Sequence, residues 1–182
     1  MNKAKQKVGS AAIRWWTFES GIGKMYAATS GRGLCRLTWL VSGPKAFVRD
    51  LRSYFPGRDI VRVERGDRII ERQIKEYLAG RRRSFDLNMD LSTLSDFERR
   101  VLRQARRVPF GATVSYGDLA RRVRRPGAAR AVGNALRKNP LAIVVPCHRI
   151  IRSDGSLGGY CGRSAVADKQ RLLSHESRAQ PL

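Results

Sequence analysis

Residues 143–160 restrict the possible folds more than any other stretch, because a run of β-branched residues ends there at a proline. Such a run predicts a short buried strand, and the strand cannot continue past Pro146 because proline has no amide hydrogen to donate to a sheet. Cys147 and His148 follow directly. We therefore expect Cys147 at the end of a strand, on backbone that the core holds in place and that opens toward solvent.

The neighbours of Cys147 suit a reactive thiol. His148 and Arg149 put positive charge near the sulfur, which lowers the pKa of a thiol and favours the thiolate. A turn at 153–155 and the glycine pair at 158–159 let backbone pass close to the group that the sulfur attacks. The alternative is that Cys147 is an inert packing residue, and this motif alone leaves both interpretations open.

The composition indicates a polyanionic partner. The 182 residues include 37 Lys and Arg against 15 Asp and Glu, a net charge of +22, and DNA, RNA or an anionic membrane surface would attract it. No apolar run is long enough to span a membrane, so we expect a cytoplasmic, nucleoid-associated protein without a membrane partner. Three cysteines and two histidines, without paired spacing, argue against a disulfide framework and a structural zinc site.

The hydrophobic pattern predicts an α+β chain of four segments. These are a basic arm at 1–10, an α/β supporting domain at 11–80, a connecting segment at 81–94 and a C-terminal domain at 95–182. The arm is either a frayed end or a nonspecific DNA-binding tail.

The supporting domain begins with alternating apolar residues, which predict strands at 13–18, 24–29 and 33–40. Pro44 then opens one helix, Asp67 caps another, and residues 60–63 could add an edge strand. We expect a small sheet with its helices on one side and no chemistry of its own. Cys35, inside the third strand, is expected to be a packing residue.

The C-terminal domain contains a predicted helix-turn-helix unit. A capping box at Ser95 and Glu98 opens a first helix, and two short helices follow at 116–123 and 128–138 around a Pro-Gly turn. In the last of these helices, four residues are expected to face inward: Ala131, Val132, Ala135 and Leu136. Its small side chains suit either close approach to a DNA groove or simple close packing between helices.

Cations surround this unit and suit contacts with DNA phosphates, so affinity for DNA should fall steeply with salt. They are Arg121, Arg122, Arg124, Arg125, Arg137 and Lys138.

Several motifs together resemble the O6-alkylguanine-DNA alkyltransferase family, the methylated-DNA–protein-cysteine methyltransferases. They are Pro146-Cys147-His148-Arg149-Ile150, Asn139-Pro140, Gly158-Gly159-Tyr160, and the stretches 108–111, 114–120 and 129–135. The resemblance covers roughly residues 85–176 well and the first eighty only loosely. It implies an RNase H-like N-terminal sheet with helices and a mostly helical, winged-helix-like C-terminal domain.

The resemblance implies a relay in which His148 takes the proton of Cys147 through a water and Glu176 orients the imidazole. Asn139 would join the recognition helix to the cysteine segment. The alternatives are a solvated carboxylate for Glu176 and a helix-ending amide for Asn139. From Tyr160 to Glu176 the spacing is two residues longer than the family pattern, near residue 162. No cofactor is implied.

The resemblance also implies that the target base is flipped out of the duplex. Arg130 would occupy the gap through the minor groove, and Tyr116 would rotate the adjacent phosphate; the alternatives are a plain phosphate contact and a core ring. Further expected base, alkyl-group and DNA contacts are Tyr160, Cys161, Ile150, Val145, Ser115, Ala129 and Gly133.

The function implied is direct reversal of DNA damage by a monomer. Cys147 would take the alkyl group from O6-alkylguanine once per molecule and without cofactor, and O4-alkylthymine is the other candidate substrate. Three alternatives remain: a non-catalytic alkyltransferase-like damage binder, a cysteine hydrolase, and a basic transcription factor with an inert cysteine.

Overall fold

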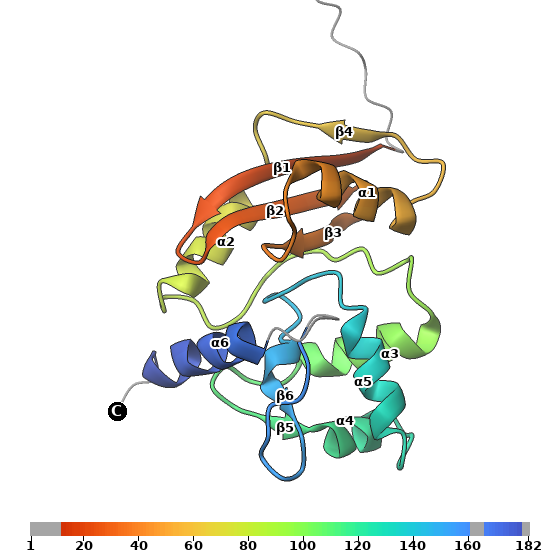
Figure 1. Ribbon diagram of the computed structural model, residues 1–182, viewed down its shortest axis with the longest axis vertical. Helices are drawn as coiled ribbons and strands as arrows, with labels where there is room; N and C mark the ends of the chain where they lie inside the picture. Colours follow the sequence, from red (N-terminus) through yellow and green to blue (C-terminus); the bar gives the residue numbers. More distant parts are fainter. Residues whose placement is uncertain (1–11, 161–165, 180–182) are drawn as a thin grey trace, which may run out of the picture.

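The computed structural model describes residues 12–160 and 166–179. A four-stranded sheet dominates the N-terminal half, and helices dominate the C-terminal half below it (Figure 1). The α+β class is therefore confirmed. The predicted arm at 1–10 lies outside the described residues. Within the described part of the chain, no helix is long and apolar enough to cross a membrane.

The sheet has the order β3-β2-β1-β4. Strands β1 (Ile13–Ser20), β2 (Gly23–Ser30) and β3 (Gly33–Thr38) form an antiparallel meander, and β4 (Ile60–Arg62) adds to β1 in parallel. The three predicted strands and the edge strand are thus confirmed. Cys35 is buried in β3 and its thiol donates to the Ala28 carbonyl, which agrees with a packing role.

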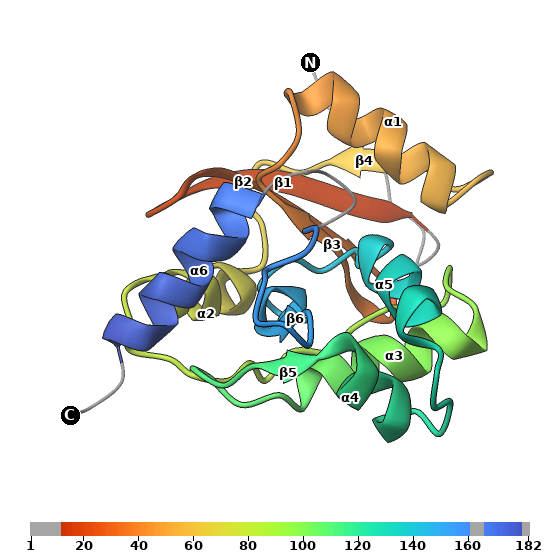
Figure 2. The ribbon, with the colours of Figure 1, turned by 60° about the horizontal axis from the view of Figure 1, so that its bottom comes forward.

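The two N-terminal helices cover opposite faces of the sheet, so the prediction of helices on one side was wrong. Helix α1 (Pro44–Tyr54) packs on the face that contains Trp15 and Tyr26, and α2 (Arg68–Leu78) packs on the face that contains Trp16 and Met25 (Figure 2). Neighbouring strand residues point to opposite faces. Because both faces of β1 and β2 are apolar, each face needs a covering layer.

The α2 face of the sheet continues into the core of the C-terminal half. One cluster of buried side chains runs from Trp16 through Leu37 and Leu141 to Leu172. Backbone bonds reinforce this contact, because the Leu37 amide donates to the Pro140 carbonyl at 2.9 Å and the Ala142 amide to the Leu37 carbonyl at 3.0 Å. The sheet therefore fixes the segment that precedes Cys147.

The C-terminal half begins with helix α3 (Asp96–Arg106), whose predicted capping box between Ser95 and Glu98 is present. Strand β5 (Val114–Ser115) leads into α4 (Tyr116–Arg122), and the turn 123–128 joins α4 to α5 (Ala129–Arg137). Strand β6 (Ile150–Ile151) pairs in parallel with β5, and α6 (Val166–Arg178) closes the described chain.

Helix α5 buries Val132, Ala135 and Leu136 as predicted, but Ala131 is exposed, contrary to the prediction. The three buried positions form one stripe at the i, i+3, i+4 spacing. Ala131 lies about 100° around the helix from Val132 and so misses this stripe.

Candidate active site

The apolar segment before Cys147 is a tight turn, so the prediction of a buried strand there was wrong. The Val145 amide donates to the Leu141 carbonyl at 2.9 Å, and Ile143 has a left-handed φ of 72°. Cys147 is the first residue of a short 3₁₀ helix, Cys147–Arg149. The β-branched residues are buried because the core surrounds the turn, and not because a sheet contains them.

Asn139 holds this turn together and reaches the sulfur. Its Oδ1 accepts from the Leu141 amide at 3.0 Å, and its Nδ2 donates to the Val145 carbonyl at 2.9 Å and to Cys147 Sγ at 3.3 Å. Side-chain bonds of this kind compete with a sheet ladder for the same backbone groups, which explains why no strand forms. A hydrogen bond to sulfur favours the thiolate over the thiol.

Cys147 is only 4% exposed, yet it lines a cavity of about 670 Å³ that also touches helix α5. The cavity thus connects the sulfur to the helix that carries Arg130. The other lining residues come from α4, α5 and the loop 152–159; they are Tyr116, Gly117, Ala129, Gly133, Asn134, Leu136, Arg137, Arg152, Ser153, Asp154, Gly158 and Gly159.

His148 and Glu176 form a fully buried pair beside the sulfur-bearing residue. His148 Nε2 lies 2.8 Å from Glu176 Oε1, and both side chains are 0% exposed. The alternative of a solvated carboxylate at the helix end is therefore wrong. Helix α6 brings Glu176 inward because it packs on the 3₁₀ helix, and its buried face also contains Leu172.

Further donors surround the Glu176 carboxylate. The Tyr77 hydroxyl donates to Oε1 at 2.6 Å, the Gly111 amide to Oε2 at 2.9 Å, and Arg149 Nη2 to Oε1 at 2.8 Å. Tyr77 and Gly111 were not predicted as site residues from the sequence. Tyr77 carries only the periodicity of a core helix residue, and no local signal announces its partner, which lies 99 positions later.

These contacts set the protonation of the pair. Burial works to raise the pKa of Glu176, but hydrogen bonds from His148 and Arg149, with their charges, outweigh it and hold that pKa well below its usual range. Burial lowers the pKa of His148, against the opposing effect of Glu176. An ionised carboxylate can only accept, so Nε2 carries the proton of a neutral imidazole. Nδ1 is then the basic atom, and it is buried with no hydrogen-bond partner among the described residues.

The positive charge that was predicted near the sulfur, from His148 and Arg149, is directed elsewhere or absent. Arg149 turns its guanidinium to Glu176 and to the Val108 carbonyl, which Nη1 reaches at 2.6 Å. Its charge is therefore balanced by the carboxylate, and the lowered pKa of His148 leaves that ring neutral. The surroundings of Cys147 supply a base and a hydrogen-bond donor rather than two free cations.

Tyr116 opens α4 and faces the cavity, half-buried against the loop 152–159. Burial raises the pKa of its hydroxyl. The loop approaches so closely that a Cβ on Gly158 would lie 3.0 Å from the Tyr116 hydroxyl oxygen. Buried Lys169, from α6, donates to the carbonyls of Ile150 and Leu157. It thereby connects strand β6 to the loop that contacts Tyr116.

The other predicted site residues lie in different surroundings. Ala129 and Gly133 line the cavity, as Arg130 does, and Ser115 caps α4 through the Asp118 amide at 3.0 Å. Tyr160 is buried, with its ring centroid 6.4 Å from that of His148. Val145 and Ile150 are fully buried and are not among the residues that line the cavity, and their part in an apolar slot for the alkyl group stays a prediction. Cys161 and the longer spacing near residue 162 lie outside the described residues.

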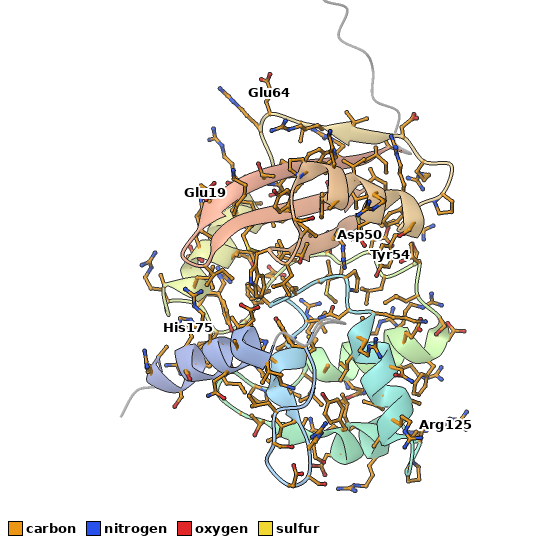
Figure 3. The ribbon with its side chains drawn as sticks, viewed as in Figure 1. Glu19, Asp50, Tyr54, Glu64, Arg125 and His175 are labelled. Carbon is orange, nitrogen blue, oxygen red and sulfur yellow. The ribbon has the colours of Figure 1, made fainter. Side chains whose placement is uncertain are left out.

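The predicted cations around α4 and α5 are all exposed; Figure 3 shows Arg125 projecting from the turn between these helices. Arg121 pairs with Asp118, and Lys138 pairs with Glu98. In the part of the chain that the structure describes, Arg122, Arg124 and Arg137 have no ion-pair partner, so their charge is available to an external anion.

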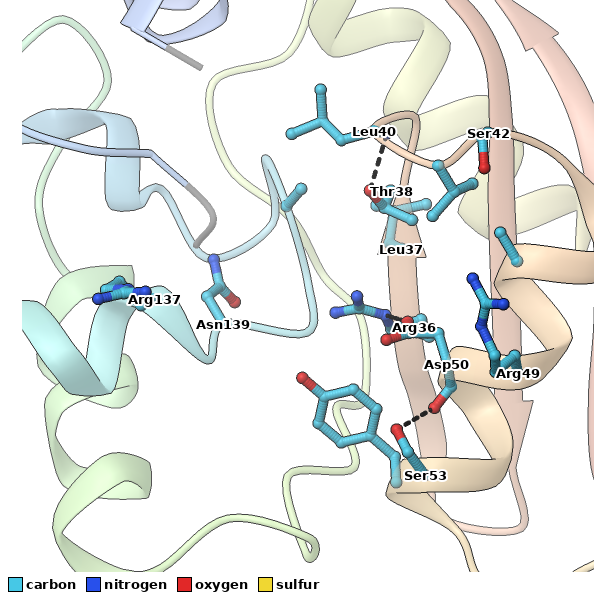
Figure 4. Close-up of a pocket in the computed structure, with 14 residues that line it drawn as sticks. Arg36, Leu37, Thr38, Leu40, Ser42, Arg49, Asp50, Ser53, Arg137 and Asn139 are labelled. Atoms are coloured by element: carbon cyan, nitrogen blue, oxygen red, sulfur yellow. Dashed lines mark hydrogen bonds and ion pairs between the residues drawn. The ribbon is translucent and has the colours of Figure 1, made fainter. Parts of the chain in front are cut away.

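A second cavity, of about 440 Å³, separates α1 from the end of α5 (Figure 4). Arg137 and Asn139 lie on one side, and Arg36, paired with Asp50 at 2.6 Å, lies on the other. Cys147 does not line this cavity, so of the two cavities only the one described above contains the candidate nucleophile. Within the described residues, no cluster of three or more His, Cys, Asp or Glu side chains could hold a metal ion.

Comparison with known proteins bears on this arrangement. A family model described as the DNA binding domain of 6-O-methylguanine DNA methyltransferase matches residues 96–178. The methylated-DNA–protein-cysteine methyltransferase of Methanosarcina acetivorans is 35% identical over 159 residues, which cover 87% of this chain and 95% of the relative. The chain belongs to this family.

The chain is also similar to other members of the methylated-DNA–protein-cysteine methyltransferase family. The protein of that name from Mycolicibacterium paratuberculosis is 49% identical over 109 residues, or 60% of this chain, and the match spans only 64% of the relative's length. A crystal structure of Mycobacterium tuberculosis OGT in complex with DNA is 34% identical, covers 92% of this chain and 95% of that one, and superposes with a TM-score of 0.74. The family membership therefore rests on both sequence and fold.

Proposed function

We propose that this protein repairs DNA by moving the alkyl group of O6-alkylguanine in a duplex onto Cys147, once per molecule. The observation that carries the proposal is that the Cys147 sulfur lines a cavity shared with α5, directly beside a buried His148–Glu176 pair. A reactive sulfur, a base and a docking helix therefore converge on one site. The family membership supports the same activity.

Docking begins with the exposed cations around α4 and α5, which suit DNA phosphates and place α5 against the minor groove. Cys147 is only 4% exposed, so its sulfur is out of reach of a base that is stacked in a duplex. The target nucleotide must therefore rotate out, at a cost of a few kcal/mol. Arg130 on α5 stands at the cavity rim and would fill the gap, and Tyr116 would crowd the neighbouring phosphate.

Activation of the sulfur uses the geometry around His148. Nδ1 of the neutral imidazole takes the thiol proton through a bridging water, while Glu176 stabilises the imidazolium through Nε2. The Asn139 amide, 3.3 Å from the sulfur, stabilises the thiolate. Asn139 is thereby more than a connection between segments, because it also contacts the reacting atom.

The transfer itself is an in-line displacement. The thiolate attacks the alkyl carbon, the carbon–sulfur bond forms, and the bond from that carbon to O6 breaks with its electron pair on the guanine. The guanine anion then takes up a proton, with Tyr160 as the proposed donor. Exchange with solvent returns a proton to the Tyr160 hydroxyl and removes the proton held on His148, so both groups end neutral. The thioether is not hydrolysed, so the protein is consumed in the reaction.

One experiment separates this function from the alternatives. The protein is mixed with a duplex that contains one O6-methylguanine, and intact and peptide masses are measured. We expect one methyl on Cys147, in stoichiometric yield. Many turnovers per molecule would indicate a hydrolase instead, and tight binding without a mass change would indicate a non-catalytic damage binder. Cys147→Ser should bind the duplex and gain no methyl.

A further inference from the structure

Tyr77 belongs to α2 in the N-terminal half, yet its hydroxyl reaches the carboxylate that orients His148. The hydroxyl donates to Glu176 Oε1 at 2.6 Å, and the same oxygen accepts from His148 Nε2 at 2.8 Å. Tyr77 Oη also lies 3.4 Å from His148 Nε2. All three side chains are fully buried, so these bonds do not compete with water. Tyr77, from the N-terminal half, therefore shares this carboxylate oxygen with His148 and Arg149, from the C-terminal half.

The remaining groups around this pair are fixed in other contacts. Burial raises the pKa of Tyr77, with Glu176 adding to the effect, so the phenol keeps the proton that it donates. His175 Nε2 lies 2.8 Å from the Tyr77 carbonyl and also packs against its ring. The titratable and charged groups that face His148 and Glu176 are Tyr77 from α2, Arg149 from the 3₁₀ helix, Tyr160, and Lys169 from α6. His175 contacts Tyr77.

We infer that Tyr77 is a positioning residue that limits the basicity of His148 by holding negative charge on Glu176 Oε1. A carboxylate oxygen that already accepts a strong hydrogen bond attracts the Nε2 proton of the imidazole less, and stabilises the imidazolium less. The N-terminal half thus adjusts the pH at which the base becomes available. This inference rests on the proposed function only where it concerns catalysis. The effect of the Tyr77–Glu176 hydrogen bond on the basicity of His148 does not depend on that function.

The test is a direct titration of His148 by NMR, which the presence of only two histidines simplifies. In Tyr77→Phe the ring stays and the hydroxyl is lost, so the His148 titration midpoint should rise by about half to one pH unit. Site-specific 3-fluorotyrosine at position 77 donates more strongly and should lower the midpoint. Tyr26→Phe is the matched control, because Tyr26 is buried on the other face of the sheet and should leave the midpoint unchanged.

The outcomes separate this inference from the proposed function. An unchanged or lowered midpoint in Tyr77→Phe, or an equal rise in Tyr26→Phe, would overturn it. If Tyr77→Phe does not fold, the fluorotyrosine protein decides alone through its opposite shift. In the pH profile of the single-turnover rate on O6-methylguanine DNA, the acid limb should shift in the same direction as the His148 titration midpoint. If the parent protein transfers no methyl group, the proposed function fails while the titration still decides the role of Tyr77.

Discussion

Replacing Glu176 by glutamine should destabilise the protein far more than the same change at its surface. Glu176 is fully buried and accepts from His148 Nε2 and Arg149 Nη2, each at 2.8 Å. Glutamine removes the negative charge and leaves the buried Arg149 guanidinium without a carboxylate partner among the described residues. Breaking a buried ion pair from one side costs about 3–5 kcal/mol. For a chain of this length, that lowers Tm by about 6–20 °C.

The control is Glu76→Gln, a similar charge on α2 that is closer to solvent. Glu76 pairs with Arg82 at 2.8 Å and with Arg72 at 3.7 Å, and its side chain is 28% exposed. Pairs of this kind contribute less than about 1 kcal/mol. Urea unfolding of the parent and both variants at neutral pH gives the three free energies of unfolding. Equal losses in the two variants would refute the reasoning from burial.

The pH dependence adds a second check. The pKa of Glu176 in the folded protein lies below its value in the unfolded chain, which is about 4.3. Its stabilisation is therefore fully present above the unfolded pKa and is lost as pH falls toward the folded pKa. The gap in unfolding free energy between the parent and Glu176→Gln should be widest above about pH 5 and should narrow in acid. A gap that stays constant from neutral to acid pH would show that the ionised carboxylate is not its source.

Three further predictions concern the cavity. Arg130→Ala should slow repair of duplex DNA but preserve reaction with a free O6-alkylguanine base, and equal loss on both substrates in rate assays would contradict a flipping role. Asn139→Ala should lower stability by about 1–3 kcal/mol and raise the pKa of Cys147, measured from the pH dependence of thiol alkylation; an unchanged thiol pKa would exclude its contact with the sulfur. Gly158→Ala should reduce activity by displacing Tyr116, because Gly158 has a φ of +67° and its new Cβ would meet the tyrosine hydroxyl at 3.0 Å; full activity at unchanged Tm would contradict this.

The secondary structure was predictable where its causes are local. Asp67 caps α2, and the box of Ser95 with Glu98 opens α3, because both interactions lie within one helical turn. The strands β1 to β3 follow from alternation and glycine turns. The division into a supporting domain and a C-terminal domain stays a prediction. One cluster of buried side chains spans both halves of the chain, so the packing of the core does not mark a boundary between them.

The failures share a different cause. The β-branched run before Cys147 has the composition of a strand, but Asn139 engages its backbone and holds it in a turn. The prediction that both helices lie on one side of the sheet failed for another reason. Which face α1 and α2 each cover depends on the path of the chain after the sheet, and the alternation of residues along one strand does not specify that path. In the first case a side chain a few positions away, and in the second the packing of distant segments, overrides the preference of the strand residues.

The sequence by itself pointed to Cys147 as the candidate nucleophile, to its neighbour His148, to the basic helical pair and, through the motif resemblance, to the carboxylate of Glu176. Only the tertiary structure decided how these groups are charged. It brings Tyr77 and Gly111 to one buried carboxylate from distant parts of the chain, and it turns Arg149 away from the sulfur toward that carboxylate. The physical reason is that protonation depends on burial and on all the partners that converge in space, and these partners share no pattern along the chain.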